Sequence, residues 1–471
     1  MSTASATPGA PGSIDDLKQL LLFDVKVKVA VDGVLRGKFM SKDKFLGAVA
    51  SEGFGFCSVI FGWDMHDSVY TRELAISNKE NGYCDIMASI DLSTFRRIPW
   101  ENNVPFFLVS FFDPKTSAPI CADPRGVLRK VVDNAAAHDL ECISGVEFEI
   151  YSETPESVAQ KGFTRLQPLT PGMHGYSLLR TQLNQEYFHA LFDESLKFGI
   201  DIEGHHTETG PGVLETALAY TSAMRIADNA ILYKFLAKSV GLKHGVLPSF
   251  MAKPWGNLPG CSGHVHVSLK DREGRNAFSL SEADQYLSQL GEHFLAGVLD
   301  GLPDGRIFLF GYGLVPTING YKRLVGGEAF WAPNAVTYGY DSRAASIRII
   351  SPPSVPPSAT RLEVRVPGAD MNPYFALSAI FQLGMRGITK QLKLTTPPIS
   401  TYQSYPARKE VTSLPSSLED ATNAMMKPDS IAREVFGDDF VDHFGATREH
   451  EVRLWNAAVT NWEVERYLEL A

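Results

Sequence analysis

The chain has 471 residues, 44% of them hydrophobic and 21% charged, which is ordinary for a globular protein and enough for two or more domains. Its formal net charge of −10 argues against general nucleic-acid binding, because that function requires a basic surface. No apolar run approaches the roughly 18–20 residues that span a bilayer, and we expect no secretory signal at the N-terminus. The cysteines favour a reducing, cytoplasmic location, because they form neither a C-x-x-C pair nor a plausible disulfide framework: Cys57, Cys84, Cys121, Cys142 and Cys261.

The first part of the chain predicts a tail followed by a small β domain. Residues 1–13 are rich in Ser, Thr, Ala, Pro and Gly, and we expect them to be disordered. Short strands and few helix signals follow. The predicted elements are a helix over 15–22 and strands over 23–31 and 35–40. We therefore expect an N-terminal domain over 14–115 and a larger domain over 116–471.

The larger domain alternates helices with strands. Helices are predicted over 126–138, 181–198, 213–241, 281–300, 373–393 and 447–470. Strands are predicted over 143–151, 200–207, 246–252, 263–270, 344–350 and 361–366. Long loop-rich segments are expected between them, and such loops inside a compact domain are usually functional.

Three of these strands alternate apolar residues with polar ones. A period of two is typical of a β-strand, whose successive side chains point to opposite faces. One face would be apolar, and the other would carry these side chains: Glu147 and Glu149; His264, His266 and Ser268; Arg361, Glu363 and Arg365. Charges at that density repel unless a divalent cation and an anionic ligand compensate them. We therefore interpret the three strands as walls of one metal- and anion-binding cavity.

Taken one at a time, these motifs also admit structural interpretations. The two strand glutamates would suit a solvated face, and an H-x-H pair alone is a weak metal signal. Glu208 and Glu215 bracket a Gly-Pro-Gly loop, where carboxylates suit a hard cation. Glu215 would equally suit the first turn of a helix, where the helix dipole favours negative charge.

Arginines are concentrated in the last third of the chain, interleaved with Glu328 and Glu363. A guanidinium group is well suited to planar recognition of phosphate and carboxylate. Any one of them would suit a surface ion pair, but together they imply a polyanion such as a nucleoside triphosphate: Arg323, Arg343, Arg348, Arg361 and Arg365. Neither G-x-x-x-x-G-K-[ST] nor a strand-linked G-x-G-x-x-G occurs, so the sequence supports neither P-loop nor Rossmann chemistry.

Seven ordered blocks make the chain resemble the glutamine synthetase superfamily, and its class I more than the short eukaryotic type. The blocks are Gly145–Tyr151, His205–Glu215, Phe250–Pro254, Gly260–Leu269, Asn319–Leu324, Ser342–Arg348 and Arg361–Pro367, the last leading to Asn372-Pro373-Tyr374. The resemblance runs over nearly all of residues 15–471. It implies an α+β fold with a small β-grasp N-terminal domain. The large catalytic domain would contain an antiparallel sheet funnel flanked by helices.

The resemblance also implies Mg²⁺ or Mn²⁺ as cofactors, two or three per site, and ATP as co-substrate. One cation site would be Glu149, Glu208 and Glu215. The second would be Glu147, His264 and Glu363. The matching ATP contacts are His266, Ser268, Arg348, Arg361 and Tyr220, with Arg343 as a further arginine on the phosphate side.

Glutamate and the amine would be bound and activated by a further set of matching residues. The glutamate side corresponds to Arg323, Arg365 and Gly260. Glu328 matches the flap carboxylate that takes a proton from the attacking amine. Asp64, contributed across a subunit interface, and Tyr176 match residues of an ammonium site.

The sequence departs from the family pattern mainly around glutamate and the amine. Pro259 stands where an asparagine usually touches glutamate, and Gly212-Val213 replaces the usual Gly-Gln. The flap over 323–328 is one residue short and lacks its proline. No tyrosine stands near 413–415, where bacterial class I enzymes carry an adenylylation site. Metal and ATP chemistry are thus better supported than the identity of the amine.

The implied reaction is ATP-dependent amide formation through γ-glutamyl phosphate, and three interpretations stay open. Ammonia is the acceptor in the first, which Asp64, Tyr176 and Glu328 favour. A larger amine, such as a polyamine, ethanolamine or an alkylamine, is the acceptor in the second, which Pro259 and the altered flap favour. A non-catalytic structural relative is the third, and the six-ligand set argues against it. The resemblance also implies a homo-oligomer of stacked rings, typically a dodecamer, without nucleic-acid or membrane partners.

Overall fold

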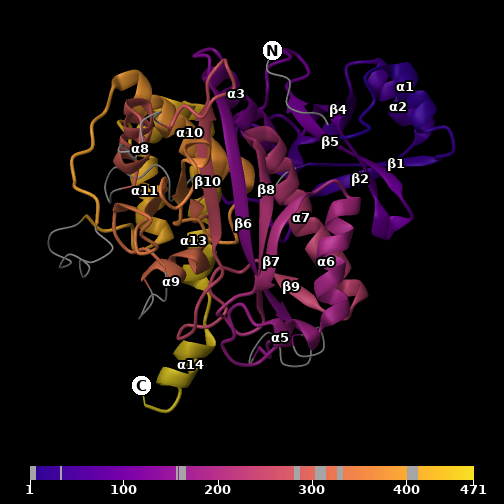
Figure 1. Ribbon diagram of the computed structural model, residues 1–471. Helices are drawn as coiled ribbons and strands as arrows, with labels where there is room; N and C mark the ends of the chain where they lie inside the picture. The colour runs from indigo at the N-terminus through magenta and orange to yellow at the C-terminus, as the bar shows by residue number, and fades with distance from the viewer. Residues whose placement is uncertain are drawn as a thin grey trace.

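The computed structural model describes residues 7–31, 34–154, 158, 166–279, 287–302, 314–325, 332–399 and 412–470 (Figure 1). These residues form an α+β structure with two sheets. The smaller sheet belongs to the N-terminal part of the chain, and the larger one runs through the middle of the molecule. The predicted α+β class is therefore confirmed. No helix among the described residues is long and apolar enough to cross a membrane.

The N-terminal sheet has the strand order β2-β1-β5-β4-β3. Its elements are α1 (Ile14–Leu20), β1 (Lys26–Val31), β2 (Arg36–Ser41), α2 (Lys42–Ala50), β3 (Phe54–Cys57), β4 (Asp85–Ile98) and β5 (Val104–Phe112). β1 and β5 run parallel, and the other neighbours run antiparallel. Alternate apolar residues such as Val27, Val29 and Phe107 are buried in a core of their own, as the period of two predicts.

Helix α2 lies in a stretch where the sequence predicted short strands and few helix signals. The hydroxyl of Ser41 caps its first turn by accepting the backbone N–H of Lys44 at 3.3 Å. Phe45 and Ala48 enter the core from one face of the helix. A helix of nine residues has little intrinsic stability, so its stability comes from this packing rather than from local propensity.

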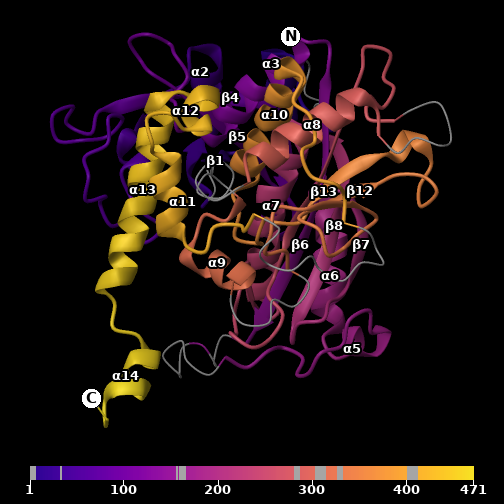
Figure 2. The same cartoon turned by 90° about the vertical axis from the view of Figure 1, so that its left-hand side faces the viewer.

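The larger sheet has the order β11-β12-β13-β10-β6-β8-β7, with β9 paired to β6. Figure 2 labels its strands β6, β7, β8, β12 and β13. Its strands are β6 (Glu141–Glu153), β7 (Ile202–Thr207), β8 (Val213–Ser222), β9 (Leu247–Ser249), β10 (Gly263–Lys270), β11 (Tyr338–Tyr340), β12 (Ile347–Ile350) and β13 (Arg361–Val364). Only the β11–β12 pair is parallel among these described strands. The remaining pairs are antiparallel, in keeping with the predicted antiparallel sheet.

The predicted helix over 213–241 is wrong in its first third. Residues 213–222 form strand β8, and only the following residues form a helix. Leu, Glu and Ala favour a helix locally, but β8 pairs with β6 on one side and β7 on the other. The two ladders override that local preference. The alternating burial of β8 then turns one of its faces toward the core.

Helices form the other main regular elements of the larger domain among the described residues. They are α3 (Pro124–Ala136), α5 (Leu178–Gln182), α6 (Gln185–Lys197), α7 (Ala223–Lys243), α8 (Gln289–Asp300), α9 (Ile318–Val325), α10 (Pro373–Lys390), α11 (Leu418–Met425), α12 (Ile431–Phe436), α13 (Asp438–Ala457) and α14 (Asn461–Tyr467). α3, α7 and α10 pack against one another, and α3 and α7 also contact β6. The predicted helix over 447–470 is split into α13, which begins earlier, and α14, which projects from the body of the molecule (Figure 1).

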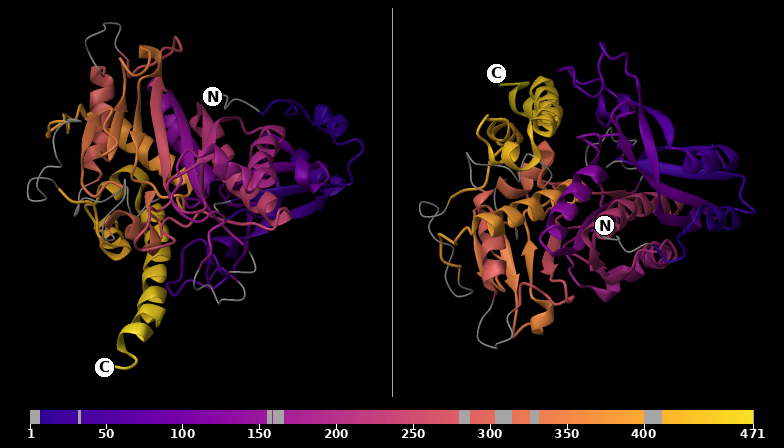
Figure 3. Two further views of the ribbon diagram at one scale, coloured as in Figure 1. Left: turned by 60° about the horizontal axis from the view of Figure 1, so that its bottom comes forward. Right: turned by 90° about the horizontal axis from the view of Figure 1, so that it is seen from above.

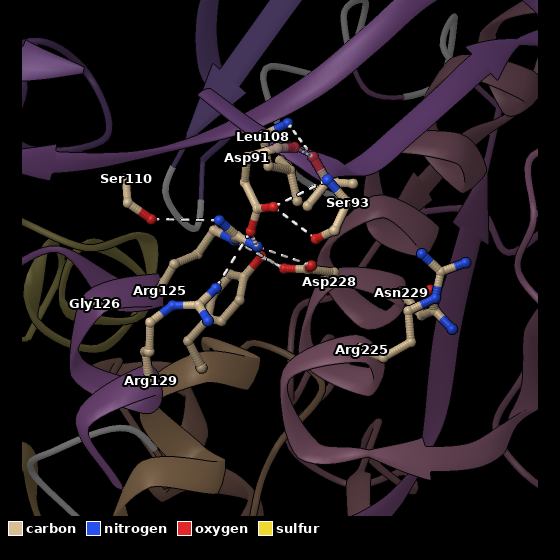
Figure 4. A network of polar contacts seen from close by, with 12 residues as sticks. Asp91, Ser93, Leu108, Ser110, Arg125, Gly126, Arg129, Arg225, Asp228 and Asn229 are labelled. Atoms are coloured by element: carbon tan, nitrogen blue, oxygen red, sulfur yellow. Dashed lines mark hydrogen bonds and ion pairs between the residues drawn. The ribbon is translucent and has the colours of Figure 1, made fainter. Parts of the chain in front are cut away.

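A buried polar network joins the N-terminal sheet to the helices of the larger domain (Figure 4). Arg125 of α3 donates from Nε and Nη2 to the two carboxylate oxygens of Asp228 on α7, at 3.0 and 3.1 Å. Its Nη2 also donates to Asp91 of β4 at 2.9 Å. The Tyr374 hydroxyl of α10 donates to Asp228 at 2.6 Å. Four elements are thereby fixed around one guanidinium group that is 2% exposed.

The predicted disordered tail over 1–13 is described only from Thr7 onward. Thr7 is buried, and its backbone N–H donates to the Ser93 carbonyl at 2.9 Å. Its hydroxyl accepts a hydrogen bond from Arg225 of α7. Residues 1–6 lie outside the described residues.

Candidate active site

The register of the larger sheet brings the polar faces of its central strands together. Glu147 of β6 lies opposite His264 of β10. On the other side of β10, His266 lies opposite Glu363 of β13, which in turn lies opposite Arg348 of β12. Segments far apart in the sequence therefore present their functional side chains on one face of the sheet.

Glu147, His264 and Glu363 form a compact group of candidate metal ligands. Each offers one ligand atom, and these three atoms lie within 4.8 Å of one another. Nδ1 of His264 is 3.5 Å from Oε2 of Glu147 and 3.5 Å from Oε1 of Glu363. Burial and the charge of Arg365 lower the pKa of His264, so its ring is neutral at pH 7, as a metal ligand requires. One imidazole and two carboxylates suit Mn²⁺ or Mg²⁺.

Hydrogen bonds keep Glu147 ionised. Burial alone would raise its pKa, but hydrogen bonds with His264 and His266 outweigh burial and hold that pKa well below its usual range. Nε of Arg361 donates to Nδ1 of His266 at 3.1 Å, so the ring proton of His266 lies on Nε2. That nitrogen then donates to Glu147 at 3.0 Å. Glu147 is therefore a charged and oriented candidate ligand.

Glu363 is held between two arginines. Its Oε2 accepts from Nη1 of Arg348 at 2.9 Å, and its Oε1 accepts from Nη1 of Arg365. Nε of Arg348 donates to Oδ1 of Asp341 at 2.9 Å, and the Ser354 hydroxyl donates to Oδ2 of Asp341 at 2.9 Å. Such outer contacts orient metal ligands and tune their charge. The arginines that the sequence associated with phosphate thus surround a candidate cation ligand.

A second group of carboxylates lies beside this triad. Glu149 lies opposite Glu215 across β6 and β8, and its Oε2 accepts the backbone N–H of Ser262 at 2.6 Å. His206 of β7 stands between two carboxylates, with Nε2 3.4 Å from Glu215 and Nδ1 3.9 Å from Glu208. Glu215 belongs to a strand, so the alternative of a first-turn helix carboxylate is wrong.

The charges of this second group are coupled. Burial and the carboxylates of Glu215 and Glu208 raise the pKa of Glu149 to about 8. A hydrogen bond with Glu215 raises the pKa of His206 to about 8. Both groups therefore hold a proton at neutral pH when no cation is bound.

We expect divalent cations to release protons when they bind at neutral pH. A cation among these carboxylates favours ionised Glu149 and deprotonated His206, so both pKa values fall and the protons leave. Because both pKa values are about 8 without the cation, release should be roughly one to two protons per site at pH 7. It should fade above about pH 9. Mn²⁺ titration in weakly buffered solution with a pH indicator measures this, and pH-independent release would contradict the raised pKa values.

Gly260 and Arg323 meet at the entrance to β10. A Cβ on Gly260 would lie 2.3 Å from the Ala252 carbonyl oxygen and 3.0 Å from Cγ of Arg323, so only glycine fits there. Arg323 is buried, and its Nη2 donates to the carbonyls of Pro367, at 2.9 Å, and Val366. Its Nε is buried without a hydrogen-bond partner in the described part of the chain. A buried donor of that kind suits an anionic group.

Two further predicted nucleotide contacts lie on the same face. Ser268 follows His266 by two residues along β10, so the two side chains share a face. Tyr220 of β8 is exposed, and a Cβ on Gly145 would lie 3.4 Å from its Cβ. Because Gly145 and Glu147 share a face of β6, Tyr220 lies on the triad side of the sheet.

Tyr176 and Arg343 lie near the second carboxylate group. The Tyr176 ring stacks on the imidazole of His206, with 4.3 Å between centroids. Its backbone N–H donates to the Thr207 carbonyl at 2.7 Å, which fixes the residue beside β7. Arg343 is exposed, and its charge acts on the Tyr176 hydroxyl, whose pKa burial and the nearby carboxylates raise.

Asp64 lies apart from this arrangement in the described structure. Asp64 belongs to the N-terminal domain, where its Oδ2 lies 3.2 Å from Nε2 of His450 on α13. Glu328 lies outside the described residues. Their roles at an active site stay predictions.

His206 and Asp341 make polar contacts at the candidate site, but the sequence analysis gave neither residue a role there. His206 precedes Glu208 by two residues, so a strand face shared by the pair was a usable signal. Asp341 gave no such signal. It lies just after β11 with φ +47°, and only the structure brings it to Arg348.

Comparisons with known proteins show the family of the chain. Residues 121–467 match the family model of the glutamine synthetase catalytic domain. Type-1 glutamine synthetase 2 of Dictyostelium discoideum is 44% identical over 454 residues, covering 94% of this chain and 84% of the relative. Glutamate–isopropylamine ligase of a Pseudomonas species is 33% identical over 446 residues, covering 94% of each. The structure of GmaS with ADP has a TM-score of 0.81 at 23% identity, covering 98% of this chain and 100% of that one, which shows the fold. The chain with this triad and these arginines belongs to the glutamine synthetase family of ATP-dependent glutamate–ammonia or glutamate–amine ligases.

Proposed function

We propose that the chain forms a γ-glutamyl amide from glutamate and ammonia, with ATP, through a γ-glutamyl phosphate intermediate. The observation that carries the proposal is the ionised carboxylate–imidazole triad that shares one sheet face with three arginines. Phosphoryl transfer needs such a surface, because its catalysis rests on positioning and on neutralising phosphate charge. The relative from Dictyostelium, a glutamine synthetase by name, supports ammonia as the acceptor.

Mg²⁺ or Mn²⁺, when bound, would neutralise charge on the phosphates. The residues that would hold the cations are Glu147, His264 and Glu363 in one group and Glu149, Glu208 and Glu215 in the other. The chain's own cationic groups would orient the phosphates and the nucleotide: Arg343, Arg348 and Arg361 with His266, Ser268 and Tyr220. The described geometry of the triad supports the first group more directly than the second.

Glutamate would be held by Arg323, Arg365 and Gly260, and the buried open Nε of Arg323 supports an anionic ligand there. An oxygen of the γ-carboxylate attacks the terminal phosphorus of ATP, and ADP leaves. The amine then attacks the γ-carbonyl carbon, phosphate leaves, and Glu328 takes the proton from the amine. Exclusion of water protects the acyl phosphate from hydrolysis.

Ammonium would be bound by Tyr176 and by Asp64 of a neighbouring subunit. A ring in which a repeated heterologous interface closes on itself would bring the two residues together. We propose stacked rings, with a dodecamer as the expected size. The apolar residues exposed on and after α14, including Trp462 and Leu468, support burial of this segment in an assembly.

A larger amine is the second candidate acceptor. The relative from Pseudomonas, a glutamate–isopropylamine ligase by name, favours it. Glutamate-dependent phosphate release from ATP should be measured against ammonia, methylamine, isopropylamine, ethanolamine and putrescine. The highest kcat/KM with ammonia supports the proposal, and the highest value with an organic amine replaces ammonia by that amine.

Replacing Glu328 by Ala is expected to separate the two half-reactions. Glutamate phosphorylation should persist, because the base acts only on the attacking amine. Amide formation should fall by about 10²–10⁴-fold, the usual effect of losing a general base. Pulse-chase trapping of the acyl phosphate beside an amide assay measures both steps. Amide formation at the wild-type rate would show that another group is the base.

A further inference from the structure

The carboxylate of Asp64 is fixed from two directions. The backbone N–H groups of His66 and Ser68 donate to its Oδ1 at 2.8 and 2.9 Å. On the other side, Nε2 of His450 lies 3.2 Å from Oδ2. Nη2 of Arg36 donates to the Asp64 backbone carbonyl at 2.6 Å, which ties the loop to β2. The Asp64 side chain is 11% exposed, so little rotation is left to it.

His450 has a single protonation pattern that satisfies its neighbours. Its Nδ1 lies 3.1 Å from the Thr71 hydroxyl and 3.4 Å from Nη2 of Arg453. Arg453 can only donate, so Nδ1 accepts and the ring proton lies on Nε2. Nε2 therefore donates to Asp64. The ring is 3% exposed, and the Tyr70 ring packs edge-to-face against it at 5.1 Å.

Among the described residues, these contacts leave one acceptor position of Asp64 open. A carboxylate offers about four lone-pair positions. Two on Oδ1 are used by the backbone of residues 66 and 68, and one on Oδ2 is used by His450. A partly buried, oriented carboxylate with one remaining acceptor suits a small cation that donates a single hydrogen bond to it. Helix α13 and the loop after β3 thus jointly define the direction of that acceptor.

We propose that His450 is a positioning residue for the ammonium site: from α13 it fixes the rotation of the Asp64 carboxylate so that its open acceptor faces the neighbouring subunit's site. The inference rests on the proposed function, because it takes Asp64 to bind ammonium. It goes beyond that function by adding α13, which lies beside the N-terminal domain (Figure 3), to the substrate-binding machinery. Thr71 assists by fixing the tautomer of His450.

Two substitutions of His450 test the proposal as a matched pair. His450→Gln keeps an amide N–H near the place of Nε2, whereas the shorter His450→Asn does not reach it. His450→Asn should raise KM for ammonia roughly ten- to a hundredfold, because a misplaced binding group loses much of its effect. Its kcat and its KM for ATP should stay close to wild type. His450→Gln should restore most of the lost KM.

Asp64→Asn separates failure of this inference from failure of the proposed function. If KM for ammonia is unchanged in Asp64→Asn, Asp64 does not bind ammonium and this inference fails. The proposed amide-forming activity is then tested separately, by the assay with ammonia and the organic amines. A raised KM in Asp64→Asn with wild-type KM in His450→Asn overturns the positioning role. If KM for ammonia rises equally in His450→Gln and His450→Asn, His450 serves only the packing of α13, and the positioning role is again overturned.

Melting temperature and assembly mass should be recorded for every variant. If His450→Asn does not fold, Thr71→Val provides the second test, since it removes only the hydroxyl that bonds to Nδ1. Thr71→Val should shift KM for ammonia in the same direction by a smaller factor. A wild-type KM in Thr71→Val, combined with a folded protein, counts against the proposal.

Discussion

Replacing Glu147 by Gln is expected to lower kcat/KM by more than about a hundredfold and to remove most of the metal-dependent stabilisation of the fold. Groups that only orient a metal ligand are worth about 10–100-fold in metal affinity or activity, so a ligand should be worth more. Gln keeps the shape of the side chain but removes the charge that a hard cation requires. The described contacts of the Glu147 carboxylate are with His264 and His266. Replacing it by Gln therefore leaves no buried charged group without its ion-pair partner.

Thermal melts with Mn²⁺ and ATP, with and without EDTA, measure the stabilisation. A ligand at a hundred times its Kd stabilises the native state by about 2.7 kcal/mol, which the wild type should show and the variant should largely lose. Glu141→Gln is the matched control, because Glu141 is exposed at the start of the same strand. Identical EDTA-sensitive shifts in wild type and Glu147→Gln would remove Glu147 from the cation site.

The central strands of this site were predictable because local pattern and tertiary role agree there. The alternation in 263–270 predicted β10 with its observed bounds. Alternation placed His264 on the polar face of this strand and Glu363 on that of 361–366, and the register then brought both together with Glu147. When a strand is apolar on one face and charged on the other, the period of two in its sequence predicts both the strand and the residues of its polar face.

The rest depended on contacts that no local pattern encodes. Strand β8 is rich in good helix formers, and only pairing with β6 and β7 makes it a strand. The contact of His450 with Asp64 joins residues 386 positions apart in the sequence. Asp341 reaches Arg348 through a turn rather than through a repeating face. Hydrophobic period and local propensity predict single helices and strands, whereas these contacts depend on how helices and strands pack against one another.

Replacing Arg125 by Met is expected to lower the free energy of unfolding by about 3–5 kcal/mol, the usual effect of removing one partner of a buried ion pair. Asp228 would stay buried with the Tyr374 hydroxyl as a donor but would lose Arg125, its ion-pair partner among the described residues. Arg129→Met is the matched control on the same helix, because Arg129 is 41% exposed and contacts Asp91 at 3.2 Å. An exposed pair of this kind contributes about 0–1 kcal/mol.

The double variant Arg125→Met/Asp228→Leu tells loss of a counter-charge from loss of packing. If the buried, uncompensated carboxylate is what destabilises Arg125→Met, then removing that carboxylate as well should restore much of the lost stability, as a well-packed apolar replacement does for other buried pairs. Chemical denaturation at one fixed protein concentration measures all four proteins, since assembly makes stability concentration-dependent. If Arg125→Met has the same free energy of unfolding as Arg129→Met, the network in Figure 4 is not what holds the N-terminal sheet to the larger domain. A double variant weaker than Arg125→Met would assign the effect to packing around α3, α7 and α10 instead.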